Sequence, residues 1–127
     1  MGKKLNPTTA ELKILQILWA DGPSTVKHVR ERLGTKSGYT GVLKQMQVMH
    51  ANGMVERDES QRSHIYSAEH IRERTTEGLL RDLMQKAFGG SASKLVLSAL
   101  SNEQVSKTEL KEIRKLINRL EKQNEQD

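Results

Sequence analysis

The 127-residue sequence has no cysteine, two prolines and few aromatic residues, namely one tryptophan, two tyrosines and one phenylalanine. Without cysteine, the chain forms no disulfide and offers no thiolate for metal binding or catalysis. The low aromatic content disfavours RNA, because proteins that bind single strands stack bases on aromatic rings. No apolar run approaches the ~18 residues of a membrane span, and the N-terminus carries Lys3 and Lys4 but no apolar signal segment. We therefore expect a cytoplasmic protein without membrane contact.

Patterns of catalytic and metal-binding residues are also missing. None of the four histidines, His28, His50, His64 and His70, forms the i, i+4 pair with glutamate that marks a metalloprotease helix. The acidic residues are scattered among basic neighbours, as on solvated helix faces. No glycine-rich loop follows a predicted strand to cradle a phosphate. The sequence therefore predicts a protein that is not an enzyme, with no cofactor, no metal site and no small-molecule substrate.

The charge balance favours a polyanionic partner. Lys plus Arg number 21 and Asp plus Glu number 16, which gives a formal net charge of +5 and a pI near 9.6. Hydrophobic residues make up 35% and charged residues 29%. This is a polar composition for a self-sufficient globular domain, and it indicates an elongated or oligomeric helical protein.

Residues 37–53 form the helix around which the rest of the chain is organised. At 3.6 residues per turn, one side is expected to face a core and gathers Tyr39, Val42, Leu43, Met46, Met49 and His50. The opposite side carries no acid and consists of Ser37, Gly41, Lys44 and Val48, flanked by Thr40 and Gln45. Small and polar groups without negative charge suit a helix that enters a DNA major groove, although an ordinary solvated helix face would look the same.

Two shorter helices are predicted before it. Thr8 and Glu11 have the spacing of a capping box, and Gly22-Pro23 ends the first helix, whose Trp19 is expected in the core. Ser24 or Thr25 caps the second helix, which ends at Gly34. Only residues 35–37 separate it from the organising helix. This is a helix-turn-helix arrangement, although short helical hairpins also occur in proteins that never touch DNA.

A hairpin is predicted after the third helix. The period changes from 3.6 towards 2 in residues 54–59, residues 60–62 resemble a turn, and residues 63–67 resemble a returning strand. Three helices followed by a hairpin make a winged helix-turn-helix. Arg62, Ser63 and His64 are expected to reach phosphates or a minor groove. The alternatives are that Arg62 is a solvated loop residue and that His64 is a partly buried strand residue.

The remaining sequence predicts three helices with more apolar surface than a monomer can bury. They cover residues 69–88, a short apolar segment after Gly89-Gly90, and a segment opened by a capping box of Ser106 and Glu109, with a polar, frayed tail at residues 123–127. Pairing with a second copy would bury the apolar stripe, although folding back on the winged domain is an alternative. The residues predicted at this homodimer interface are Leu79, Leu80, Leu83, Leu95, Val96, Leu100, Leu110, Ile113, Ile117 and Leu120.

The predicted fold is therefore mainly α with a small β-hairpin. A winged helix-turn-helix domain occupies residues 1–68, and a three-helix dimerisation domain occupies residues 69–127. Several segments follow a pattern that resembles the penicillinase-repressor family. They are Thr8-x-x-Glu11-Leu12-x-Ile14-Leu15-x-x-Leu18-Trp19, Gly22-Pro23-Ser24-Thr25-Val26, Gly38-Tyr39-Thr40-Gly41-Val42-Leu43, Gly53-Met54-Val55-x-Arg57, the strand from Arg62 to Tyr66, and Phe88-Gly89-Gly90-Ser91 with the helix from Ser106.

The resemblance implies a dimeric winged-helix repressor bound to a palindromic operator on double-stranded DNA. It implies that Thr40, Lys44 and Gln45 lie near base edges or phosphates. The full set of expected DNA-binding residues is Thr25, Lys27, Lys36, Ser37, Gly38, Tyr39, Thr40, Gly41, Lys44, Gln45, Val48, Arg62, Ser63 and His64. The competing hypothesis is a winged protein-interaction module that assembles through its C-terminal helices without specific DNA binding.

The sequence departs from the family at positions that concern specificity and induction. Gly41 stands where the family usually has a second threonine, and Val48-Met49 replace an Arg-Leu pair. Relatives that respond to beta-lactams are cut at an Asn-Phe step, whereas the matching bond here is Ser98-Ala99. Copper-responsive relatives use cysteines, which this chain lacks. The inducing signal is therefore left open, with regulatory cleavage at Ser98-Ala99 as one hypothesis.

Overall fold

The computed structural model of the chain describes residues 6–34 and 36–125. The predicted N-terminal segment with Lys3 and Lys4, Thr35 of the predicted turn, and the last two residues of the predicted polar tail lie outside this range. The chain divides into two compact units, one ending at Asp82 and one beginning at Leu83, and each is described by itself. The predicted domain boundary after residue 68 stays a prediction.

The first two helices begin at side-chain caps. Helix α1 covers Thr9–Asp21 and starts with the predicted capping box, in which the Thr8 N–H donates to Glu11 Oε1 at 2.8 Å and the Glu11 N–H donates to Thr8 Oγ1 at 3.2 Å. Gly22 ends α1 with φ of 80°. Helix α2 covers Val26–Leu33, and Thr25 rather than Ser24 caps it, accepting from the His28 N–H at 3.1 Å.

Helix α3 covers Tyr39–Ala51. Its inward side buries Val42, Met46 and Met49 as the periodicity predicts. The prediction that Tyr39 faces the core is wrong, because its side chain is 50% exposed. Tyr39 is the first residue of the helix, and the buried cluster begins one turn later at Val42.

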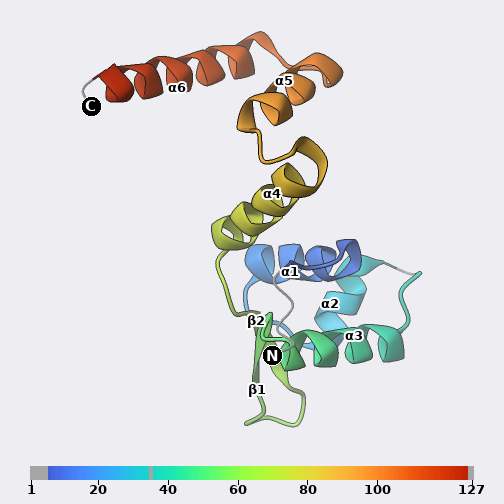
Figure 1. The fold of residues 1–127 in the computed structure, drawn as a ribbon. Coiled ribbons are helices and arrows are strands. Elements are labelled where there is room, and N and C mark those ends of the chain that lie inside the picture. The colour runs from blue at the N-terminus through green and yellow to red at the C-terminus, as the bar shows by residue number, and fades with distance from the viewer. Residues whose placement is uncertain (1–5, 35, 126–127) are drawn as a thin grey trace. The chain divides into compact units, whose positions relative to one another are not determined.

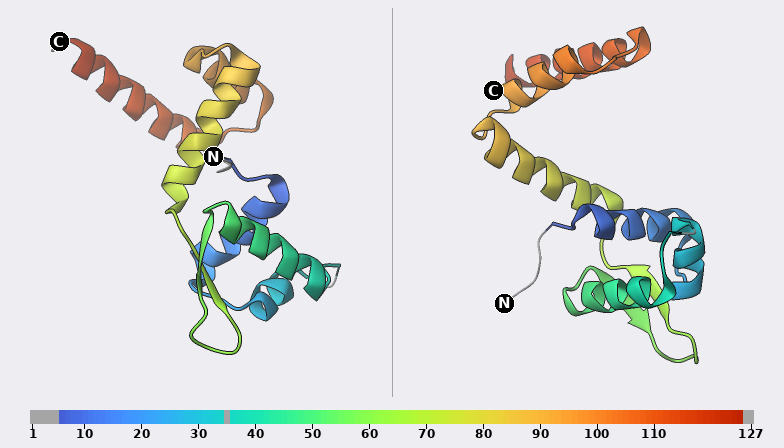
Figure 2. Two further views of the ribbon diagram at one scale, coloured as in Figure 1. Left: turned by 60° about the horizontal axis from the view of Figure 1, so that its bottom comes forward. Right: turned by 90° about the vertical axis from the view of Figure 1, so that its right-hand side faces the viewer.

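Strands β1 (Val55–Asp58) and β2 (Ile65–Ala68) form the predicted hairpin, antiparallel with Val55 opposite Ala68 and Asp58 opposite Ile65. The hairpin is fastened to the turn between α1 and α2, because Ser24 and Tyr66 exchange two backbone hydrogen bonds of 2.8 Å. Its loop projects beyond the three helices in every view (Figures 1 and 2).

One hydrophobic core holds the helices and the hairpin together. Its buried side chains come from all three helices and both strands, with the largest being Tyr66, Met46 and Met49. Trp19 is half-buried against this core, and its indole Nε1–H donates to the carbonyl of His70 at 2.9 Å. The Arg72 guanidinium lies 5.8 Å from the centre of the Trp19 ring, so the chain is held against α1 where the next helix begins.

Three helices follow: α4 (Arg72–Phe88), α5 (Ala92–Asn102) and α6 (Lys107–Glu125). Helix α4 starts three residues later than predicted, and α6 continues through most of the segment predicted to fray. Ser91 caps α5, and Ser106 with Glu109 forms the predicted capping box at α6. The predicted fold class, mainly helical with one small hairpin, is confirmed. Within residues 6–34 and 36–125, none of the helices has the length and apolar character needed to cross a membrane.

Candidate nucleic-acid interface

The outward side of α3 is an exposed polar surface without acidic residues. Burial of Met46 and Met49, both fully inaccessible, fixes which side of the helix faces outward. The outward side chains are small, polar or basic, apart from Val48, whose side chain is 43% exposed. The exposed members of this surface, called the α3 face below, are Thr40, Gly41, Lys44, Gln47, Val48 and Ala51.

Gln45 and Gln47 lie differently from what the sequence suggests. Gln45 is half-buried, and its amide Nε2 donates to Glu11 Oε2 at the start of α1, at 3.4 Å. Gln47, which the sequence analysis missed, is exposed on the α3 face instead. The spacing of Thr40, Lys44 and Gln47 is i, i+4 and i+7, so the helical period would have found Gln47 if it had been counted from Thr40.

The start of α3 presents backbone N–H groups rather than a side-chain cap. Gly38 is the N-cap residue, and it makes no side-chain hydrogen bond. The Ser37 carbonyl accepts from Arg30 Nε at 3.1 Å, which ties α2 to this turn. Lys27 and Lys36 are exposed nearby in the chain, whereas the Thr25 hydroxyl is occupied as the cap of α2.

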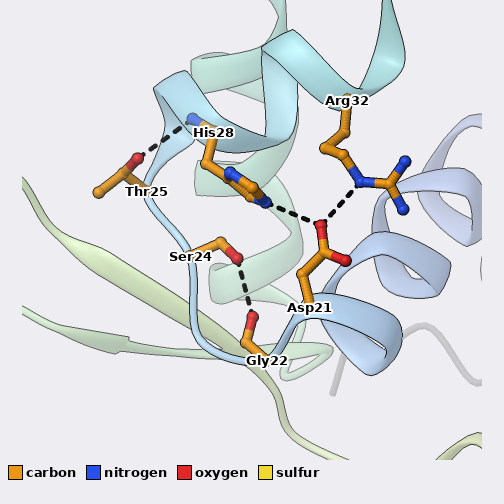
Figure 3. Close-up of polar contacts among 6 residues, drawn as sticks. All are labelled: Asp21, Gly22, Ser24, Thr25, His28 and Arg32. Carbon is orange, nitrogen blue, oxygen red and sulfur yellow. Dashed lines mark hydrogen bonds and ion pairs between the residues drawn. The ribbon is translucent and has the colours of Figure 1, made fainter.

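An ion cluster joins the end of α1 to α2 (Figure 3). Asp21 Oδ2 accepts from Arg32 Nε at 2.8 Å and lies 2.7 Å from His28 Nε2. The hydrogen bond from Arg32, followed by that from His28, lowers the pKa of Asp21 below its ordinary value, because both favour the ionised carboxylate. The cluster therefore holds α2, the helix that precedes the α3 face.

The hairpin loop carries both signs of charge. Arg62 and Ser63 are exposed and His64 is half-buried, so the alternative of a partly buried strand residue describes His64. Arg57, which the sequence analysis names only as part of the family pattern, lies opposite Tyr66, and its Nη2 donates to Glu59 Oε2 at 3.2 Å. Hydrogen bonds to Tyr66 and then Glu59 raise the pKa of Arg57. Residues i and i+2 share one side of a strand, and this spacing was the available signal for the Arg57–Glu59 pair.

Asp58 stabilises the hairpin loop by a hydrogen bond within the loop. Its Oδ1 accepts from the Ser60 N–H at 2.9 Å, and this hydrogen bond lowers the pKa of Asp58. In the part of the chain that the structure describes, no three His, Cys, Asp or Glu side chains are grouped so that they could hold a metal ion.

These features define a winged helix-turn-helix protein with an exposed α3 face. Residues 7–119 match the family model described as penicillinase repressor, and the chain belongs to that family. It is therefore a DNA-binding transcriptional repressor of the winged-helix class, and the prediction that it is not an enzyme is confirmed.

Several solved structures are similar to the chain, and two examples follow. The solution structure of apo-NmtR shares 27% identity over 79% of this chain and 74% of that chain, with a TM-score of 0.45. The structure of a cysteine-to-serine mutant of Lactococcus lactis ZitR shares 16% identity over 97% of this chain and 81% of that chain, with a TM-score of 0.42. Among the curated proteins, no match was found.

Proposed function

We propose that this repressor binds a palindromic operator in the cytoplasm as a homodimer, and that an inducing signal releases it. Occupation of the operator would block transcription. The single observation that carries the DNA-binding part is the α3 face, which is exposed, free of acids and continuous along the helix. A helix of 13 residues is about 20 Å long, and the major groove is about 12 Å wide, so α3 has suitable dimensions for the groove.

Each residue of the α3 face has a distinct part in this proposal. Lys44 neutralises a phosphate, Thr40 and Gln47 hydrogen-bond base edges, and Val48 contacts a thymine methyl group. Gln45 supports α3 through its bond to Glu11 rather than reading a base. The exposed Arg62 and Ser63 of the hairpin loop contact the backbone or a minor groove.

The homodimer is supported by the apolar surface of the C-terminal helices. No residue of α4, α5 or α6 is buried within the single chain. Of the predicted interface residues, Leu80, Leu83, Val96, Leu110, Ile117 and Leu120 are exposed. A dimer formed there would present two copies of α3 to successive major grooves, with centres about 34 Å apart or a multiple of it.

The inducing signal stays open, with cleavage in α5 as one hypothesis. Ser98 and Ala99 lie inside the helix, so a protease would first have to open it, because proteases bind extended chain. Mass spectrometry of the repressor from induced cells tests this hypothesis. Intact chain under full induction would contradict it.

The experiment that tests the proposed function is random-oligonucleotide selection with the purified full chain. The expected result is a two-fold symmetric site whose affinity falls steeply with salt, because bound lysines and arginines release counterions from DNA. Failure to recover any site, together with a monomer in solution, would contradict the proposal. If the Lys44→Ala, Arg62→Ala double variant binds DNA with the same affinity as the unaltered chain, the result favours the protein-interaction hypothesis.

A further inference from the structure

Two glycines lie inside helices, where a glycine is unfavourable. Gly41 is in α3 and Gly78 is in α4, whereas the other described glycines end, cap or separate helices. Glycine within a helix lowers stability relative to alanine, because the unfolded chain has more conformations to lose. Each of the two positions therefore needs a reason other than helix formation.

Gly78 has a close neighbour within the chain. A Cβ atom built at this position would lie 2.9 Å from Asn6 Oδ1, which is closer than real Cβ contacts. The atom that it would meet is the tip of the flexible Asn6 side chain, which can shift to make room. The close neighbour of Gly78 is therefore part of the same chain.

Gly41 has no such neighbour. A Cβ atom built there meets no heavy atom within 4 Å, and the backbone does not have the positive φ that favours glycine. Gly41 is exposed on the α3 face, three residues before Lys44 and seven before Val48, so the three lie on one side of the helix. Nothing in the described chain requires the missing side chain.

We propose that Gly41 is a specificity-determining residue whose missing side chain lets DNA approach the α3 main chain. A base edge or sugar of the operator occupies the volume that a Cβ would fill. The inference rests on the proposed DNA binding and adds to it a steric requirement at one position. A larger residue at this position would hold the helix farther from the DNA, so the glycine also selects which half-site fits.

The test is the Gly41→Ala variant of the full chain, with the duplex that the unaltered protein selects as the probe. The variant is expected to raise Tm by about 2–5 °C, because alanine favours the helix. It is expected to weaken binding to that duplex about tenfold or more, because its methyl group collides with the DNA. Gly41→Thr is expected to select a different half-site from random duplexes.

Gly78→Ala is the matched control, because it makes the same substitution in a helix away from the α3 face. It displaces the Asn6 side chain and is expected to bind the duplex within about twofold of the unaltered chain. Equal binding by Gly41→Ala would overturn this inference and leave the proposed function intact. A lower Tm for Gly41→Ala would also overturn it, by showing that the glycine serves the fold. If the unaltered chain selects no duplex, the proposed function fails and the inference with it.

Discussion

The winged part of the chain and the helices after it differ in what they bury. Every buried residue of the described chain lies between Glu11 and Tyr66. Helices α4, α5 and α6 contain none, although α5 and α6 begin at side-chain caps. The winged part therefore has a hydrophobic core of its own, whereas the later helices need another surface to cover their apolar residues.

The exposed apolar residues lead to the same contrast. All of the large exposed hydrophobic residues except Tyr39 and Val48 lie after β2. Those two lie on α3, where we propose that DNA binds. The winged part folds on its own core and also carries the α3 face, whereas the described chain leaves the apolar surface of the later helices uncovered.

The largest expected effect comes from a charge within the apolar stripe of α6. Ile117→Asp should weaken the dimer about 100-fold or more, because each interface would have to bury two carboxylates. Loss of the dimer should lower affinity for a two-fold site by about 10²- to 10⁴-fold, because the second half-site no longer binds within the same complex. Sedimentation equilibrium and DNA titration measure the two effects.

Asn118→Asp, which adds the same charge at the next residue of α6, is the control for this prediction. Asn118 is exposed and polar, so its variant should dimerise like the unaltered chain. If both variants dimerise equally well, the stripe on α6 is not the interface.

The same truncation in the two parts should have different consequences. Ile14 is 3% exposed in α1, and Ile14→Ala should lower the free energy of unfolding by about 2–5 kcal/mol at any protein concentration. Ile117 is 47% exposed in the single chain, so the effect of Ile117→Ala should grow with concentration as the dimer forms. Thermal unfolding across a 100-fold range of protein concentration measures both effects. If the stability losses of the two variants depend on concentration in the same way, Ile117 is not buried by dimer formation.

Features set by neighbouring residues were predictable from the sequence. The capping boxes at Thr8 and Ser106 and the helix end at Gly22 depend on residues within one turn, and all three are as predicted. The alternation that predicted the hairpin likewise depends on local spacing. These signals were sufficient for the fold class.

Side-chain directions on α3 were less predictable, because distant residues decide them. Gln45 turns towards Glu11, which is 34 positions away in the sequence. Tyr39 is exposed because the core does not reach the first residue of the helix. A helical wheel gives the faces of an isolated helix, but it does not show which neighbours cover its ends.

Removal of a lysine should affect DNA binding differently in the two parts of the chain. Lys44→Ala should weaken operator binding about tenfold and reduce the slope of log affinity against log salt by about 1 for each subunit, because a phosphate contact is lost. Lys115→Ala removes the same charge from an exposed site on α6 and should leave the slope unchanged. Equal slopes for the two variants would show that net charge, rather than the α3 face, attracts the DNA.

The smallest expected effect concerns the ion cluster at the end of α1. The pKa of Asp21 is lowered by Arg32 and His28, so the folded chain holds its carboxylate ionised at a pH where the unfolded chain binds a proton. The cluster therefore stabilises the fold above the ordinary pKa of an aspartate, about 3.9, and this contribution disappears as pH falls through the lowered pKa. Asp21→Asn should give a small drop in Tm at pH 7 that disappears as pH falls through the lowered pKa. Glu31→Gln removes one negative charge from α2 and controls for net charge. If its Tm changes with pH as that of Asp21→Asn does, the effect belongs to overall charge and the cluster does not fasten α2 to α1.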